Sequence, residues 1–158
     1  MVQPNGNVGT RKDLALYRLQ TAKGDLKSAR ILLTAEEYKS ANNRAYYAIF
    51  HAVNAIHALS GMAFKRHKDA IGNFNKEYVK TEIFPRELGR KIGEAEEIRH
   101  ASDYDDFYIA SWEEAERQVA VAEEFIQIAE KYCMDQLQEP DSEAVVDKTV
   151  ADDRTGNL

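Results

Sequence analysis

Apolar residues recur at alternating spacings of four and three positions through much of the chain. This spacing places them on one stripe of an α-helix, whereas in a strand they would fall on both faces. The first set predicts a long helix over about residues 12–37. The second predicts a helix that starts near Ser40 or Asn42, either of which can cap it, and ends before Gly61. The two sets are Ala15, Leu19, Ala22, Leu26, Ala29 and Leu33, then Ala45, Ile49, Ala52, Ile56 and Leu59.

Two further helices follow a less regular basic segment, residues 62–81, which predicts a loop with one short helix. Pro85 suits a first helical turn, and the helix that it starts is expected to fail near Ser102 and Asp103. Ser111 followed by Glu114 is a capping-box pattern, and it predicts a last helix that runs to about residue 133. The apolar positions of these two helices are Leu88, Ile92, Ala95 and Ile98, then Trp112, Ala115, Val119, Ala122, Phe125, Ile126 and Ala129.

Together these helices predict an all-α fold, an antiparallel bundle of four to five helices over residues 11–133. Residues 1–10 predict a flexible start, and residues 134–158 predict a disordered tail because they are acidic and lack aromatic side chains. The length of 158 residues, with 44% hydrophobic residues, corresponds to one domain with a proper core. Exposed parts of Tyr17, Tyr46 or Phe50 on a leftover apolar face would favour a homodimer.

Charge is spread unevenly along the chain, which has a formal net charge of −6. Residues 134–158 hold seven acidic and two basic side chains, whereas residues 65–91 hold eight basic and four acidic ones. An anionic partner is therefore expected near residues 65–91. The single cysteine, Cys133, excludes a disulfide within the chain and fits a reducing compartment. Because no segment is apolar enough for a membrane span or a secretion signal, the sequence predicts a cytoplasmic protein with no membrane contact.

A second, polar stripe follows the predicted helix over residues 42–59. Arg44, Tyr47, His51 and Asn54 are spaced by three, four and three residues, so they share one helix face. His51 could deprotonate a ribose 2′-hydroxyl while Arg44 holds a phosphate, which would cleave RNA without a metal or other cofactor. In the structural alternative, Arg44 bridges to a carboxylate on a neighbouring helix and His51 is an ordinary hydrogen-bonded residue. The spacing alone favours this alternative.

The basic segment combines cations with aromatic rings. Lys65, Arg66 and Lys68, with Lys76 and Lys80 further on, could bind phosphates, and nearby rings could stack on unpaired bases of single-stranded RNA. Alternatively, the cations are solvated and the rings face the bundle, an interpretation that the composition favours. The rings are Phe64, Phe74 and Tyr78.

Acidic residues surround Tyr104, just before the last predicted helix. The simpler interpretation is that they complement the helix dipole, and the functional alternative is a modification or docking site at Tyr104 or Tyr108. His57, His67 and His100 show no spacing typical of metal ligands, so no metal site is expected.

Five segments in order, over roughly residues 11–133, resemble small stand-alone prokaryotic HEPN-domain proteins. The first two segments are Asp25-Leu-Lys-Ser-Ala-Arg-Ile-Leu-Leu and Asn43-Arg-Ala-Tyr-Tyr-Ala-Ile-Phe-His-Ala. The other three are His67-Lys-Asp-Ala-Ile-Gly-Asn-Phe with Tyr78-Val-Lys, Ile98-Arg-His-Ala-Ser-Asp-Tyr-Asp-Asp and Ala122-Glu-Glu-Phe-Ile. The resemblance implies an all-α bundle, often a homodimer, encoded beside a minimal nucleotidyltransferase and acting in toxin–antitoxin or other defence systems. Active members are metal-independent RNases.

The resemblance also implies a signature, an Arg followed after four to six residues by a His near the last long helix. Arg99 stands at the expected place, but no His follows it at that spacing. Arg44 and His51 satisfy the spacing within another helix, and in some family pairs the nucleotidyltransferase adds adenylate to a tyrosine, for which Tyr104 is the nearest candidate. Two hypotheses remain. One is a metal-independent RNase in which Arg44 and Arg99 hold phosphate and His51 is the base. The other is an inactive dimeric module that binds a nucleotidyltransferase or a nucleotide.

Overall fold

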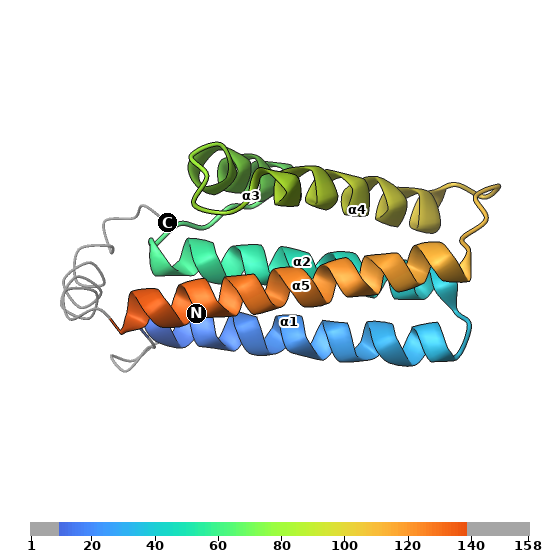
Figure 1. Cartoon of the computed structure of the whole chain (residues 1–158), viewed down its shortest axis with the longest axis horizontal. Helices are drawn as coiled ribbons and strands as arrows, with labels where there is room; N and C mark the ends of the chain where they lie inside the picture. The colour runs from blue at the N-terminus through green and yellow to red at the C-terminus, as the bar shows by residue number, and fades with distance from the viewer. Residues whose placement is uncertain (1–9, 139–158) are drawn as a thin grey trace.

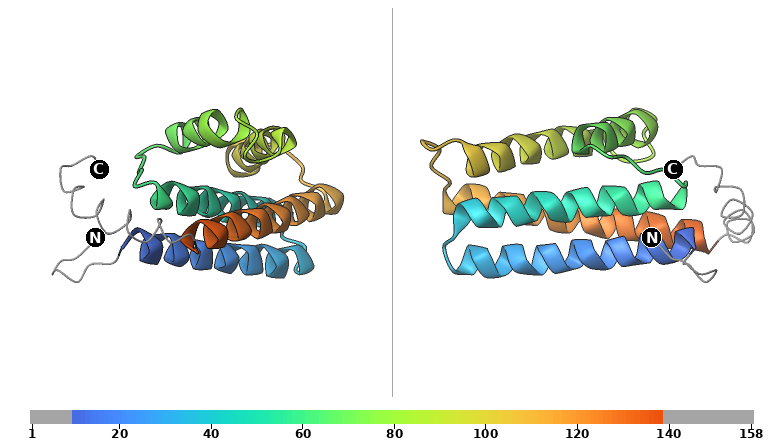
Figure 2. Two further views of the ribbon diagram at one scale, coloured as in Figure 1. Left: turned by 60° about the vertical axis from the view of Figure 1, so that its left-hand side comes forward. Right: turned by 180° about the vertical axis from the view of Figure 1, so that it is seen from behind.

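The computed structural model describes residues 10–138, and within this range every regular element is helical. The elements are α1 (Arg11–Thr34), α2 (Tyr38–Leu59), α3 (His67–Phe74), the π-helical turn η1 (Asn75–Val79), α4 (Arg86–Tyr104) and α5 (Trp112–Leu137). Helix α2 is the centre of the bundle, because α1, α4 and α5 all pack against it. Figure 1 shows α1 on one side of α2, and α3 with α4 on the other; Figure 2 shows the same arrangement from two further directions. The predicted all-α bundle is confirmed.

Small side chains line the seam between α1 and α2. Ala15, Ala22 and Ala29 of α1 are fully buried, and so are several alanines of α2, which lets the two helices approach closely. Helix α1 starts with a complete capping box, in which the Thr10 hydroxyl accepts from the Asp13 amide and the Asp13 carboxylate accepts from the Thr10 amide. The apolar pattern therefore predicted this pair of helices because it follows the buried stripe, except at the last position of each set, Leu33 and Leu59, which are only partly buried.

The predicted turn between these helices was wrong in detail. Helix α1 ends at Thr34 rather than near residue 37, and Glu36 adopts a left-handed backbone conformation with a φ of 64°. Helix α2 begins at Tyr38, so neither Ser40 nor Asn42 caps it. Asn42 is instead buried inside the helix, where its Nδ2 donates to Ser102 Oγ of α4 at 3.1 Å. The sequence pattern did not reveal this because an Asn amide can either cap a helix or donate from inside a bundle, and spacing does not distinguish the two.

The segment expected to be a loop with one short helix is more ordered than that. Helix α3 continues directly into η1, and Phe74 at their junction is fully buried. The Tyr78 ring stacks on Phe74 with centroids 5.4 Å apart, and Phe64 packs on His57 at 4.8 Å. The three rings thus face the bundle, which is the interpretation that the composition favours. Phe74 is fully buried, so the alternative of stacking on an RNA base does not apply to this ring.

Helices α4 and α5 are longer than predicted. Helix α4 passes through Ser102 because that hydroxyl is buried and accepts the hydrogen bond from Asn42. The Ser111 hydroxyl caps α5 by accepting from the Glu114 amide at 3.1 Å, which is one half of the predicted capping box. The other half does not form, because the Glu114 carboxylate accepts from the Tyr108 hydroxyl instead. Helix α5 extends to Leu137, beyond the predicted end near residue 133.

Burial raises the pKa of the Cys133 thiol to about 12, and the charge of Glu130 adds to the shift, so this thiol stays protonated and is a poor nucleophile at neutral pH.

Residues 1–9 and 139–158 lie outside the described residues, and with them most of the predicted flexible start and acidic tail. No helix among residues 10–138 is long and apolar enough to cross a membrane.

Candidate functional site

The polar stripe of α2 exists in the structure, and it faces α1. Arg44, Tyr47, His51 and Asn54 are each partly exposed, while the neighbouring positions of α2 are mostly buried in the bundle. Asn54 takes part through its main chain, since its carbonyl accepts from Arg18 Nη1 of α1 at 3.2 Å. The four predicted residues therefore do share one accessible face.

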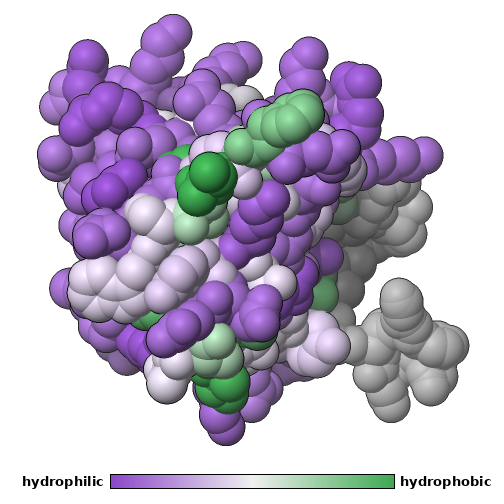
Figure 3. Space-filling model, turned by 90° about the vertical axis from the view of Figure 1, so that its right-hand side faces the viewer, coloured by the Kyte–Doolittle hydropathy of each residue, from purple (hydrophilic) through white to green (hydrophobic). Residues whose placement is uncertain are grey.

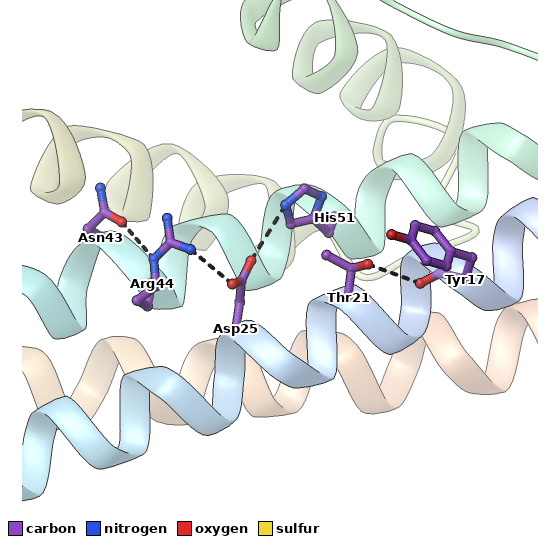
Figure 4. A network of polar contacts seen from close by, with 6 residues as sticks. All are labelled: Tyr17, Thr21, Asp25, Asn43, Arg44 and His51. Carbon is purple, nitrogen blue, oxygen red and sulfur yellow. Dashed lines mark hydrogen bonds and ion pairs between the residues drawn. The ribbon is translucent and has the colours of Figure 1, made fainter. Parts of the chain in front are cut away.

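Asp25 of α1 joins the two residues that were predicted to carry chemistry. Arg44 Nη1 donates to Asp25 Oδ1 at 2.9 Å, and His51 Nε2 lies 3.5 Å from Asp25 Oδ2. Figure 4 shows the Asp25 carboxylate between them, with Arg44 Nε also donating to Asn43 Oδ1 at 2.9 Å. The Asp25 side chain is only 15% exposed, so its charge is poorly screened by solvent. The structural alternative foresaw a carboxylate for Arg44, but the sequence did not show which one.

The surroundings of His51 favour its neutral form. Partial burial lowers the pKa of His51, the nearby Asp25 charge raises it in opposition, and the charges of Arg18 and Arg44 lower it further. A histidine with a lowered pKa is mostly unprotonated at neutral pH, which a general base requires.

Arg99 of α4 reaches the same face from the other side. Its guanidinium carbon lies 5.0 Å from the ring centroid of Tyr46 and 5.7 Å from that of Tyr47. The Arg44 guanidinium carbon lies 5.1 Å from the Tyr47 ring, so guanidinium groups from two helices flank one tyrosine. Arg99 Nη1 is 3.6 Å from Asp103 Oδ2, and the Arg99 side chain is 13% exposed. The structure thus unites Arg44 and Arg99, which lie far apart in the sequence.

His67 completes the cluster and was missed as a site residue. It is the first residue of α3, and its ring centroid lies 3.9 Å from that of Phe50 and 5.5 Å from that of Tyr47. Partial burial and the charge of Arg99 lower the pKa of His67. Its occurrence in a segment that resembles the HEPN family was the only sequence signal, because the preceding loop has no periodicity.

The remaining predicted residues lie around this centre or apart from it. Lys65, Arg66 and Lys68 are exposed at the start of α3, next to His67, and Arg66 Nε is 3.1 Å from Asp69 Oδ2. Tyr104 is 67% exposed at the end of α4, where its ring packs on His100 with centroids 4.9 Å apart. Among residues 10–138, no group of three or more His, Cys, Asp or Glu side chains is placed to hold a metal ion.

Comparison with known proteins identifies the class to which this bundle belongs. The sequence model of the HEPN domain family matches residues 15–132 of this chain. A "UPF0332 protein" of Thermotoga maritima is 34% identical over 119 residues, covering 75% of this chain and 90% of that protein. "Putative toxin MJ0142" of Methanocaldococcus jannaschii is 31% identical over 114 residues, covering 72% and 78%. The chain belongs to the HEPN domain family.

Solved structures agree on the fold. A HEPN domain protein of Thermotoga maritima superposes with a TM-score of 0.58 at 28% identity, covering 73% of this chain and 96% of that one. The protein TT1696 of Thermus thermophilus superposes with a TM-score of 0.63 at 20% identity, covering 74% and 96%. The second likeness concerns the fold alone.

Proposed function

We propose that this HEPN protein is a toxin-like component that cleaves RNA without a metal ion. One observation carries the proposal: Arg44 and Arg99, from two different helices, flank the Tyr47 ring beside a histidine whose pKa is lowered. Guanidinium groups bind phosphate, an aromatic ring can stack on an unpaired base, and a neutral imidazole can accept a proton. Two relatives, 31% and 32% identical to this chain, bear names that describe them as putative toxins.

The proposed reaction begins with the 2′-hydroxyl of a bound ribose. Because His51 Nε2 faces Asp25, the carboxylate favours the tautomer with its proton on Nε2 and leaves Nδ1 to accept the hydroxyl proton. The 2′-oxygen then attacks the adjacent phosphorus, and the bond from phosphorus to the 5′-oxygen breaks. The leaving 5′-oxygen takes a proton from water, so the products are a 2′,3′-cyclic phosphate and a 5′-hydroxyl. Arg44 and Arg99 offset the charge that develops on the phosphate.

RNA would extend from this centre toward the exposed cations Lys65, Arg66 and Lys68 at the start of α3. Asn54 lies at the other end of the stripe and would bind the sugar or base. Binding through these groups should weaken as salt concentration rises, because counterions are released from the RNA.

The test is incubation of the purified protein with total RNA and with a short single-stranded oligonucleotide in EDTA. The wild type, His51→Ala and Arg99→Ala are compared with His100→Ala, an exposed histidine beside Tyr104 that serves as matched control. Cleavage that leaves 2′,3′-cyclic ends in the wild type and the control, but not in His51→Ala, supports the proposal. Undiminished cleavage by folded His51→Ala contradicts it.

A second candidate function is an inactive module that binds a nucleotidyltransferase protein or a nucleotide. One surface favours it. The connection between α4 and α5 exposes Phe107 by 92% and Ile109 by 87%, and Trp112 at the start of α5 is 44% exposed. Figure 3 shows hydrophobic surface interrupting the hydrophilic cover at this end of the bundle. Clustered exposed apolar residues are typical of protein interfaces. Tyr104, the candidate for docking or modification, lies at the same end.

Co-expression with a minimal nucleotidyltransferase from the same genome tests the second candidate. If the two proteins co-elute, if Phe107→Ser with Ile109→Ser abolishes co-elution, and if no cleavage occurs in EDTA at any salt concentration, the module is the better account. A purified chain that cleaves RNA and never co-elutes with that nucleotidyltransferase excludes it.

A homodimer is also part of the proposal. Tyr46 is fully buried and Phe50 is 8% exposed, so neither can supply a dimer surface, whereas Tyr17 and Ile31 of α1 are 66% and 59% exposed. Light scattering on the wild type and on Tyr17→Ser with Ile31→Ser measures this directly. A monomeric wild type at all concentrations would remove the dimer.

A further inference from the structure

An open pocket of about 500 Å³ lies where α3, η1 and the first turn of α4 meet. None of its lining residues belongs to the cluster around Tyr47. The volume falls within the range of about 300–1,000 Å³ that is typical of small-molecule sites. The residues that matter for its chemistry are Gly72, Asn75, Lys76, Lys80, Arg86 and Gly89.

The charged side chains that line this pocket are all basic. Lys76 and Lys80 are exposed, and neither ammonium group forms an ion pair or a hydrogen bond within residues 10–138. Arg86 Nε lies 3.2 Å from Glu82 Oε2, but the Arg86 side chain remains 72% exposed, so its other nitrogens are accessible. The pocket therefore carries a positive potential that suits an anion.

The backbone around the pocket favours an anion as well. Helix α4 begins at Arg86 after Pro85, no side chain caps it, and Arg86 and Gly89 line the pocket, so the positive end of the helix dipole lies beside it. The same turn carries Glu87, which pairs with Arg90 at 3.5 Å. A Cβ atom on Gly89 would lie 3.1 Å from Val79 Cγ1 and 3.2 Å from Asn75 Oδ1, so α4 and η1 approach each other closely at this glycine. The opposite wall is a π-helical turn, an irregularity found frequently at functional sites.

One polar atom in the wall has no partner within the described chain. Asn75 Oδ1 is buried and accepts no hydrogen bond from residues 10–138. Buried acceptors without a partner are uncommon in folded proteins, and this one lies against Gly89, at the contact between η1 and α4.

We propose that this pocket binds a small phosphorylated molecule. Its phosphate lies among Lys76, Lys80 and Arg86, which donate charge-assisted hydrogen bonds, and its uncharged body lies over the side chain of Val79 and the bare backbone of Gly72. The inference is independent of the proposed RNA cleavage, since it uses no residue of that site.

Gly72 provides a sharp test because a Cβ atom there meets nothing within 4 Å. Gly72→Glu places a carboxylate beside the pocket in a helix that accepts it readily. Gly24→Glu is the matched control, because Gly24 is also helical with open space around it, on α1 and away from the pocket. The double variant Lys76→Ala with Lys80→Ala removes the two unpaired cations. Circular dichroism checks that each variant is folded.

The experiment titrates the full chain with inorganic pyrophosphate at low salt and records amide shifts by nuclear magnetic resonance. We expect saturable binding with shifts at Gly72, Lys76 and Gly89, unchanged in Gly24→Glu and weakened about tenfold or more in Gly72→Glu and in the double lysine variant. No saturation up to about 10 mM pyrophosphate, or equal binding by Gly72→Glu and the wild type, would overturn the proposal. So would the reverse selectivity, in which a six-nucleotide RNA shifts these amides and pyrophosphate does not.

Discussion

His51 and His57 both lie on α2, and burial lowers the pKa of both, yet they differ in their access to solvent and in the groups that they contact. His57 is fully buried, its Nε2 lies 2.9 Å from the Ala70 carbonyl oxygen, and aromatic rings of Phe64, Phe74 and Tyr78 surround it. His51 is partly exposed beside a carboxylate. His57 therefore joins α2 to α3 through its contact with the Ala70 carbonyl. His51 contacts a charged side chain and is open to solvent, so its second ring nitrogen is available for chemistry.

The largest expected effect is a difference in stability between the packed region around His57 and the partly exposed region around His51. Phe74→Ala empties the packed region around His57, and we expect the free energy of unfolding to fall by about 3–5 kcal/mol. Tyr47→Ala, in the partly exposed region around His51, is expected to cost clearly less because solvent and neighbouring side chains fill the space. Urea denaturation followed by circular dichroism measures both. Equal losses would mean that the two regions are equally packed and would break the comparison.

Asp25→Asn removes the carboxylate that lies beside His51 and has no counterpart at His57. We expect RNA cleavage to fall about tenfold to a hundredfold, because the His51 tautomer and the position of Arg44 are no longer fixed. Since Asp25 raises the pKa of His51, its loss lowers that pKa further, and the acidic limb of the pH–rate profile moves to lower pH. Glu123→Gln, on an exposed ion pair with Arg30, is the control. An unshifted acidic limb would show that Asp25 does not act on the base.

His57→Gln tests how the buried histidine makes the free energy of unfolding depend on pH. Burial lowers the pKa of His57 below the ordinary 6.5, although the hydrogen bond with Ala70 raises it in opposition. The folded state then binds fewer protons than the unfolded state, so this stability is present above about pH 6.5 and is lost as pH falls. Glutamine can still donate to the Ala70 carbonyl but does not titrate. We expect unfolding free energy to fall less steeply from about pH 7 to about pH 5 in this variant, and an identical slope would contradict the assignment.

The smallest effect belongs to a charge pair outside both regions. Lys23 Nζ lies 2.6 Å from Glu130 Oε2 between α1 and α5, but the side chains are 50% and 35% exposed. Solvent screens such a pair, so Lys23→Ala should change the free energy of unfolding by no more than about 1 kcal/mol and leave RNA cleavage unchanged. A larger loss of unfolding free energy would mean that this exposed ion pair contributes more to the stability of the bundle than solvent screening allows.

The fold could be predicted because its buried stripe is continuous in the sequence. Ala15, Leu19 and Ala22 repeat at helical spacing, and each is buried as the spacing requires. Element ends were harder, since Asn42 resembles a cap but donates to Ser102 from inside α2. A local pattern cannot show a partner 60 residues away.

The candidate site was predicted in part for the same reason. Arg44 and His51 share one helix, so their common face follows from spacing alone. The contributions of Asp25, His67 and Arg99 depend on how α1, α3 and α4 pack around α2, and no spacing within one helix encodes that.

The most direct test of the central claim is the product formed from a single-stranded RNA oligonucleotide in EDTA by the wild type and by His51→Ala, with His57→Gln as a second histidine variant. The account predicts 2′,3′-cyclic phosphate ends from the wild type and from folded His57→Gln, and a rate about a hundredfold or more lower from folded His51→Ala. Cyclic ends produced equally fast by His51→Ala, or no cleavage by the wild type at any salt concentration, would contradict it.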